Sequence, residues 1–179
     1  MKLFSTCAGA ILAVASLASA QGPASPGATE SKVVGGKTIA IKYSSPRVRG
    51  RVGKLFGKDG SIGKDATYPI WRGGANAATA LHTDADLDIG GLAVPKGDHS
   101  LYIDLSDPDN WKLIVNKQTG QSGLTYDTTQ EVGRVKMTMS KPPALVENLK
   151  YTITDQGGGK GMLQLEWENH IASVTFTVK

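Results

Sequence analysis

Short runs of alternating apolar and polar residues follow one another from about residue 37 to the end of the chain. In each run every second residue is apolar, which is the period of a strand with one buried face. Clear examples are Ile39–Tyr43, Ser100–Asp104 and Trp111–Val115. Turn-forming residues separate the runs, and Gly90-Gly91 joins two of them in the manner of a two-residue hairpin.

About nine such runs are present, and no 12-residue window carries the 3.6-residue period of an amphipathic helix. Many short strands with turn residues between them are typical of sandwiches, jelly rolls and barrels. The sequence therefore predicts an all-β fold, an antiparallel β-sandwich or jelly-roll-like domain of about nine strands with little helix. The apolar faces predict a core that includes Ile41, Leu101, Ile103, Leu113, Val115, Val135, Met137, Tyr151, Ile153, Leu165, Trp167 and Phe176.

The beginning of the chain has the pattern of a secretory signal peptide. Lys2 supplies a positive charge, Leu3–Leu17 is apolar or small, and Ala18-Ser19-Ala20 has the small residues of a cleavage site. We therefore expect export to the periplasm or the medium, with cleavage after Ala20. No later stretch is apolar enough to predict a membrane span.

The length of 179 residues is that of one domain. Residues 21–36 are rich in Gly, Pro, Ser and Ala, and we expect a flexible N-terminal arm there, followed by one domain over residues 37–179. The only cysteine, Cys7, lies in the expected signal peptide. The mature chain would therefore have neither a disulfide nor a cysteine nucleophile.

Charge is distributed unevenly along the chain. Residues 31–72 hold ten basic and two acidic side chains, whereas residues 73–179 hold nine basic and thirteen acidic ones. The two halves could pair with each other within the fold. Alternatively Arg47, Arg49 and Arg51 form an anion-binding surface, because the three side chains share one side if that run is extended. Nucleic acid is not an expected partner, since no aromatic residues are interleaved with these cations.

The acidic residues and histidines predict neither a metal site nor a cofactor. Asp84-x-Asp86-x-Asp88 resembles the start of an EF-hand loop, but Ile89 and Pro95 stand where that loop needs Gly and Glu. We expect the three aspartates on the solvent face of a hairpin. The three histidines have no zinc-binding spacing, and no G-x-S-x-G motif predicts a serine nucleophile.

One segment, residues 68–76, concentrates groups that suit ligand binding. Trp71 offers a stacking face, Arg72 a forked donor and Asn76 an amide, and Tyr68 is nearby. Loops on a rigid β scaffold often carry binding groups. The alternative is that Trp71 is buried and anchors the loop, while Arg72 pairs with a carboxylate.

Several elements resemble an exported bacterial family known as domain of unknown function 2911. They include Ser45-Pro46-Arg47, Gly50-Arg51, Trp71-Arg72-x-Gly74-Ala75-Asn76 and Leu165-x-Trp167-Glu168-Asn169. The resemblance covers roughly residues 38–178. It implies an exported protein and no particular activity.

Two residues depart from the pattern that the resemblance implies. Ala77 stands where relatives often carry an acid, and Ser122 stands where they often carry tryptophan. If either position completes a site in relatives, that site is lost or altered here.

These observations leave three hypotheses for function. The first is a binding module for an anionic or sugar-like ligand, the second a structural or interaction protein of the cell envelope, and the third a hydrolase with a polar pocket of arginine, asparagine and carboxylate. For the first we expect one ligand-binding surface that contains Arg47, Arg51, Tyr68, Trp71, Arg72 and Asn76.

Overall fold

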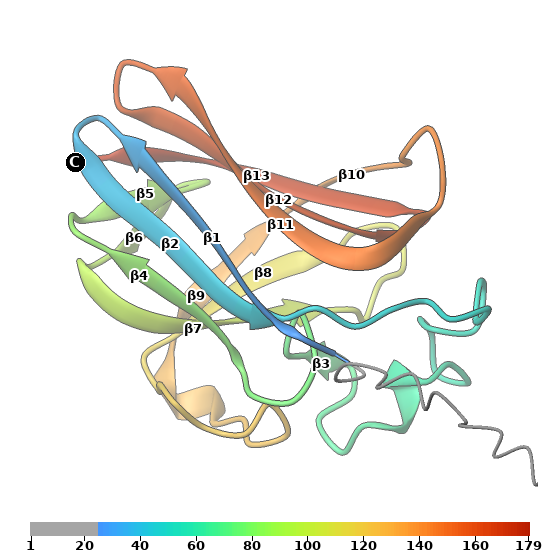
Figure 1. Cartoon of the computed structure of the whole chain (residues 1–179). Coiled ribbons are helices and arrows are strands. Elements are labelled where there is room, and N and C mark those ends of the chain that lie inside the picture. Colours follow the sequence, from blue (N-terminus) through green and yellow to red (C-terminus); the bar gives the residue numbers. More distant parts are fainter. Residues whose placement is uncertain (1–24) are drawn as a thin grey trace, which may run out of the picture.

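The computed structural model describes residues 25–179 as two packed antiparallel sheets (Figure 1). One sheet has the order β1-β2-β4-β7-β8-β9, with β3 paired to β7, and the other has the order β11-β12-β13-β5-β6, with β10 paired to β13. The strands of the first sheet are β1 (Gly27–Val34), β2 (Lys37–Ser44), β3 (Ile70–Trp71), β4 (Thr79–Thr83), β7 (Gly97–Asp104), β8 (Lys112–Asn116) and β9 (Glu131–Lys136). Those of the second are β5 (Leu87–Ile89), β6 (Leu92–Val94), β10 (Thr138–Ser140), β11 (Val146–Gly157), β12 (Lys160–Glu168) and β13 (His170–Val178).

The expected all-β sandwich with little helix is confirmed. The described residues contain thirteen strands and two 3-10 turns, η1 (Ile62–Lys64) and η2 (Thr128–Gln130). The count exceeds nine because β1, β3 and β4 were not expected, and because one expected run, residues 132–140, is divided into β9 and β10. Gly90 and Gly91 form the expected hairpin turn between β5 and β6, both with positive φ.

The core lies between the two sheets and contains the apolar faces that alternation predicts. All twelve expected core residues are buried, and none has more than 7% of its surface exposed. Residues from β2, β7 and β8 of one sheet face residues from β11, β12 and β13 of the other within a single apolar cluster. The period-two pattern therefore places the strands in the correct phase.

The expected flexible arm over residues 21–36 is wrong for most of its length. Gly27–Val34 forms β1, which pairs with β2 through a turn at Gly35 and Gly36, both with positive φ. Glu30 accepts a hydrogen bond from the backbone N–H of Ile153 in the second sheet, with 3.1 Å between the atoms. Strand β1 lies at a sheet edge and is largely polar and exposed, so it shows no apolar alternation. The expected signal peptide lies outside the described residues.

The three aspartates of the 84–88 run lie at the surface, as expected, and hold backbone groups. Asp84 accepts from the N–H of Thr38, Asp86 from that of Lys96 and Asp88 from that of Gly91. Each carboxylate therefore stabilises a strand end or a turn. Within residues 25–179 no group of three His, Cys, Asp or Glu side chains has metal-binding geometry.

His82 on β4 makes stability depend on pH. Its Nδ1 lies 2.7 Å from Asp98 Oδ1 and its Nε2 lies 3.2 Å from Asp84 Oδ1. The hydrogen bond with Asp98, and then that with Asp84, raises the pKa of His82 above its ordinary value of 6.5. The resulting stabilisation is fully present below pH 6.5 and is lost as the pH rises through the folded-state pKa.

We therefore expect His82→Gln to destabilise the protein more at pH 5.5 than at pH 8, as measured by thermal melting at both values. The variant must be compared with the wild type at each pH, because burial lowers the pKa of His99 and His170, which gives the opposite pH dependence. An equal difference at both values would contradict the role of His82.

Candidate functional site

The long connection between β2 and β3 covers one end of the sandwich and carries most of the candidate site (Figure 1). We call residues 46–65 of this connection the basic lobe. Leu55 and Ile62 are buried on its inner side. Phe56 lies between them in sequence and contacts the rings of Trp71, Trp111 and Trp167 at centroid distances of 4.9–5.7 Å. These apolar contacts attach the basic lobe to the core.

The run from Arg47 to Arg51 is a turn, so the expectation of an extended run is wrong. Arg49 and Gly50 have φ of 49° and 69°, and the N–H of Arg51 donates to the carbonyl of Val48. Two consecutive positive φ values at the centre of such a turn are typical of type I′. The turn still brings Arg47 and Arg51 together, because Arg51 Nη2 lies 2.6 Å from the carbonyl oxygen of Arg47.

The Arg51 guanidinium braces the basic lobe from within. Its Nε donates to the carbonyl of Val48 at 3.0 Å, and its Nη1 lies 3.5 Å from Ser61 Oγ. Ser61 in turn donates to the carbonyl of Lys54. Arg51 therefore fixes the turn that carries Arg47 and retains N–H groups that these contacts do not use.

Several hydrogen bonds join the second sheet to the basic lobe, including those from Leu149 to Pro46 and from Arg49 to Glu147. The N–H of Val48 donates to the carbonyl of Glu147 at 2.8 Å, and the N–H of Gly53 donates to Glu168 Oε1 at 2.6 Å. Glu168 is 3% exposed and has φ of 55°, a conformation that is uncommon for a residue other than glycine. A buried carboxylate at the β12–β13 turn thus positions the backbone next to Arg51.

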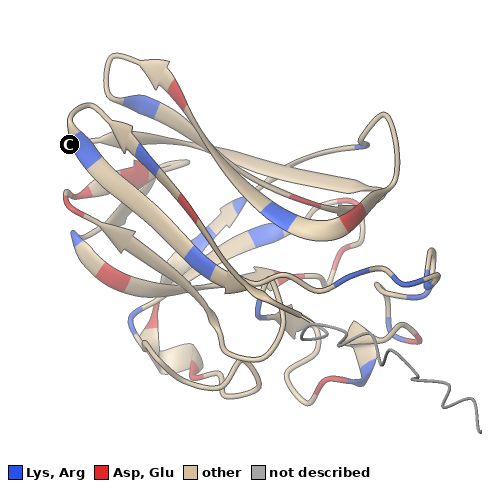
Figure 2. Ribbon diagram, in the orientation of Figure 1, with Lys and Arg blue, Asp and Glu red and all other residues tan. Residues whose placement is uncertain are grey.

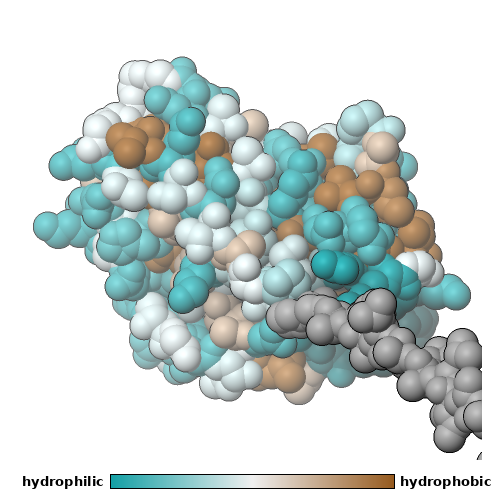
Figure 3. Space-filling model, in the orientation of Figure 1, coloured by the Kyte–Doolittle hydropathy of each residue, from teal (hydrophilic) through white to brown (hydrophobic). Residues whose placement is uncertain are grey.

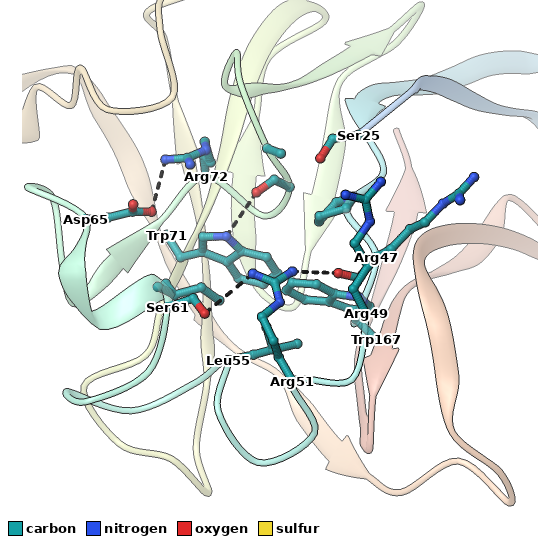
Figure 4. Close-up of a pocket in the computed structure, with 14 residues that line it drawn as sticks. Ser25, Arg47, Arg49, Arg51, Leu55, Ser61, Asp65, Trp71, Arg72 and Trp167 are labelled. Atoms are coloured by element: carbon teal, nitrogen blue, oxygen red, sulfur yellow. Dashed lines mark hydrogen bonds and ion pairs between the residues drawn. The ribbon is translucent and has the colours of Figure 1, made fainter. Parts of the chain in front are cut away.

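A cavity of about 530 Å³ opens between the basic lobe and the turn that follows β3 (Figure 4). Figure 4 shows Arg51 bonded to Ser61 and to Arg47, Arg72 bonded to Asp65, and the indoles of Trp71 and Trp167 among the lining groups. The cavity is lined by Ser25, Pro46, Arg47, Arg49, Arg51, Leu55, Ser61, Ile62, Asp65, Trp71, Arg72, Gly74, Ala75 and Trp167. Four arginine residues therefore line one cavity that has a single acidic residue, Asp65.

Three of these four arginines have no carboxylate partner. Arg72 Nη1 pairs with Asp65 at 3.1 Å, whereas Arg47, Arg49 and Arg51 form no ion pair within residues 25–179. Residues 1–24 contain no Asp or Glu at all. Glu147 accepts from the backbone N–H of Arg49 at 2.9 Å, but within residues 25–179 no ion pair neutralises the side chains of Arg47, Arg49 and Arg51.

The acidic half of the chain does not pair with the basic half in the part that the structure describes. Its carboxylates pair with cations of their own half, as in Arg134 with Asp104 and Glu131, and Lys150 with Glu166. The one ion pair of the basic half, Arg72 with Asp65, is internal to that half. The expected ion pairing between the two halves is therefore not found within residues 25–179, where Asp84, Glu147 and Glu168 instead accept from backbone N–H groups of the basic half.

Trp71 is buried and anchors its loop, which is the alternative to ligand stacking that the sequence left open. Its side chain is 1% exposed, stacks on Trp167 at a centroid distance of 5.8 Å and donates from Nε1 to the carbonyl of Gly74. It closes the bottom of the cavity and offers no open ring face for a ligand to stack on. Arg72 is paired with a carboxylate, as that alternative also proposed, and its buried Nε has no protein partner.

Four of the six expected site residues, Arg47, Arg51, Trp71 and Arg72, line this one cavity. Tyr68 and Asn76 do not line it. Asn76 is exposed with φ of 62°, and its carbonyl accepts from the N–H of Gly123, so it shapes the turn after β3. Arg49, which the charge pattern placed with Arg47 and Arg51 as an alternative, also lines the cavity, as do Ser61 and Asp65, which were not expected. Arg49 was recognisable from its spacing with Arg47 and Arg51, whereas Ser61 and Asp65 have no distinguishing pattern in the sequence.

The two departures from the family pattern, Ala77 and Ser122, lie opposite each other. They form an isolated antiparallel bridge. Neither lines the arginine cavity. Gly123, which follows Ser122, packs against the Arg72 side chain.

The fold and this cavity define an all-β sandwich with an arginine-lined cavity at one end. The chain belongs to the family of proteins of unknown function called DUF2911, whose family model matches residues 25–176. The resemblance noted from sequence motifs is thereby confirmed, and the match begins before β1. No curated protein and no solved structure shows a significant match to the chain. Among the described residues, no helix has the length and apolar character needed to cross a membrane.

Proposed function

We propose that the protein is a binding module whose arginine cavity takes a small, multiply charged anion. The observation that carries the proposal is the convergence of Arg47, Arg49 and Arg51, none of them paired with a carboxylate, on one cavity of about 530 Å³. That volume lies in the range of small-molecule sites. Guanidinium groups match the planar and tetrahedral oxygens of carboxylate, phosphate and sulfate.

The basic lobe gives the cavity the preorganisation that a binding site needs. Arg51 is held by contacts with Val48, Arg47 and Ser61, and Gly53 is held by Glu168. Side chains fixed in this way lose little conformational freedom when a ligand arrives. The cavity suits an uncharged sugar less well, because Trp71 and Trp167 are buried and their rings cannot stack on it.

A structural role for the same residues is the second candidate. Arg72 pairs with Asp65, and Arg51 bonds to two backbone carbonyls, so both brace loops at the end of the sandwich. Bracing alone leaves Arg47 and Arg49 unexplained, since neither side chain makes a hydrogen bond or ion pair within residues 25–179. A hydrolase receives less support, because the one carboxylate of the cavity is bound to Arg72 and no histidine lines it.

We further propose that the protein works outside the cytoplasm, in the periplasm or the medium. Lys2, the apolar run Leu3–Leu17 and the small residues Ala18-Ser19-Ala20 support this. Anions available in that compartment, either free or as part of envelope components, would be its ligands.

Binding can be tested with citrate, inorganic phosphate and sulfate, using thermal melting and titration calorimetry at low ionic strength. We expect at least one of them to raise the melting temperature of the wild type, since a ligand that binds only the folded state stabilises it. Arg47→Ala should fold normally, because Arg47 is exposed and its side chain makes no hydrogen bond or ion pair within residues 25–179, and it should lose most of this shift.

Lys37→Ala is the matched control for loss of charge, since Lys37 lies in the β1–β2 hairpin at the other end of β2 from the basic lobe. It should keep the full shift. The proposal is contradicted if no anion stabilises the wild type, or if Arg47→Ala and Lys37→Ala reduce the shift equally.

A further inference from the structure

The positive charge of the basic lobe extends well beyond the arginine cavity. Lys54, Lys58 and Lys64 are exposed, do not line the cavity and form no ion pair within residues 25–179. In Figure 2 the blue positions follow the lobe from the end of β2 to the approach to β3, with little red among them. Residues 46–65 hold six basic and two acidic side chains, and one of the acids, Asp65, is bound by Arg72.

Exposed aliphatic side chains accompany these cations. Val52 lies between Arg51 and Lys54 in sequence and is 46% exposed. Leu145, also 46% exposed, lies in the loop before β11, which reaches the lobe through the hydrogen bond between Val48 and Glu147 and the bridge between Arg47 and Asn148. Figure 3 shows apolar surface on this side of the molecule, where Figure 1 places the loop before β11.

Val52 is exposed and does not belong to the apolar core cluster. The next residue, Gly53, is bound by Glu168, and Lys54 and Leu55 accept from the N–H groups of Ser61 and Ile62 at 2.9 and 3.0 Å. Leu55 and Ile62 point into the core in the same stretch. The lobe thus has an apolar inner side that packs and a cationic outer side from which an aliphatic residue projects.

We propose that the outer side of the basic lobe docks on the surface of a bilayer that contains anionic lipids. Unpaired lysine and arginine side chains are attracted to anionic headgroups, and exposed aliphatic side chains among them can enter the boundary between headgroups and acyl chains. A purely polyanionic partner would use the cations and gain nothing from Val52 and Leu145. Nucleic acid and uncharged glycans favour open aromatic faces, and Phe56, the aromatic residue of the lobe, packs against Trp71, Trp111 and Trp167.

Vesicle co-sedimentation tests the proposal, with mixed phosphatidylglycerol and phosphatidylcholine vesicles compared with phosphatidylcholine alone. We expect the wild-type protein to bind the anionic vesicles, to release them at high salt and not to bind the neutral ones. The test variant combines Val52→Ser, Lys54→Glu and Lys58→Glu. Its affinity for anionic vesicles should fall by about tenfold or more, because two attractive charges become repulsive and an inserting side chain is lost.

The matched control combines Val33→Ser, Lys37→Glu and Lys160→Glu. It carries the same three types of change in the β1–β2 and β11–β12 hairpins, at the far end of the sandwich from the lobe (Figure 1). It should keep most of the vesicle binding although its net charge equals that of the test variant. Equal losses in the two variants would overturn the proposal, as would equal binding of the wild type to neutral vesicles.

Two further measurements distinguish membrane docking from binding of soluble polyanions and from the proposed binding of small anions. The single variant Val52→Ser should weaken vesicle binding and leave binding to heparin, a soluble sulfated polysaccharide, unchanged. If Val52→Ser weakens neither vesicle binding nor heparin binding, and heparin binds tightly, the lobe binds soluble polyanions and membrane docking is overturned. The triple test variant should still bind small anions, because none of its changed residues lines the cavity. Failure of vesicle binding with small-anion binding intact would therefore count against docking alone.

Discussion

Replacing Trp71 with alanine is expected to lower the free energy of unfolding by about 3–5 kcal/mol. Trp71 is 1% exposed, stacks on Trp167 with 18° between the ring planes, and contacts the ring of Phe56 edge to face. The substitution removes a whole indole from a packed cluster and leaves the carbonyl of Gly74 without its donor. Urea unfolding of the variant and the wild type measures the difference directly.

The control for this change is Trp71→Phe, which keeps a ring in the cluster but not the Nε1–H donor. It should cost clearly less than the alanine variant, since most of the apolar volume remains. A loss below about 1 kcal/mol for Trp71→Ala would mean that the indole is not the packed base of the cavity. It would then revive the hypothesis that Trp71 offers its ring to a ligand.

Replacing Arg51 with alanine is expected to weaken binding of the preferred anion by about 10- to 150-fold. Hydrogen bonds to charged groups contribute about 1.5–3 kcal/mol each, which corresponds to that range. Arg51 adds a second effect, because its bonds to Val48 and Arg47 hold the turn that presents the neighbouring arginines. Titration calorimetry with the anion that stabilises the wild type most gives the affinity change.

Arg51→Lys separates the two effects. It keeps the charge, but an ammonium group cannot reproduce the planar fork that reaches Val48, Arg47 and Ser61 together. We expect an affinity between those of the wild type and Arg51→Ala. Wild-type affinity in Arg51→Ala would contradict the role of the cavity, whatever happens to its stability.

The sequence predicted the framework of the fold well, because burial on one face imposes a period of two on a strand. Leu101 and Ile103, or Leu163 and Leu165, are recognisable for that reason alone. Strand β1 could not be recognised in this way. It is an edge strand held by backbone pairing with β2 and by Glu30, and those contacts leave no apolar pattern.

Part of the candidate site was predicted from the sequence, but one of the reasons given for it, an extended run of arginines, is not what the structure shows. Arg47 and Arg51 do lie together, but a turn with two positive φ values joins them, where an extended run was expected. Asp65 pairs with Arg72 across a loop whose path no local pattern describes. Asn76 has a side-chain amide that would suit ligand binding, yet its positive φ and its hydrogen bond with Gly123 make it a turn residue.

The most direct test of the arginine cavity is a heteronuclear NMR titration of the labelled protein with the stabilising anion. The Nε–H signals of Arg51 and Arg72 and the indole N–H signal of Trp71 report on the cavity, and those of backbone amides in the β1–β2 hairpin report on the far end. We predict saturable shifts for the cavity signals, all with one dissociation constant, and none for the hairpin. Shifts that do not saturate, or that are spread evenly over lysine-rich segments far from the cavity, would contradict the account.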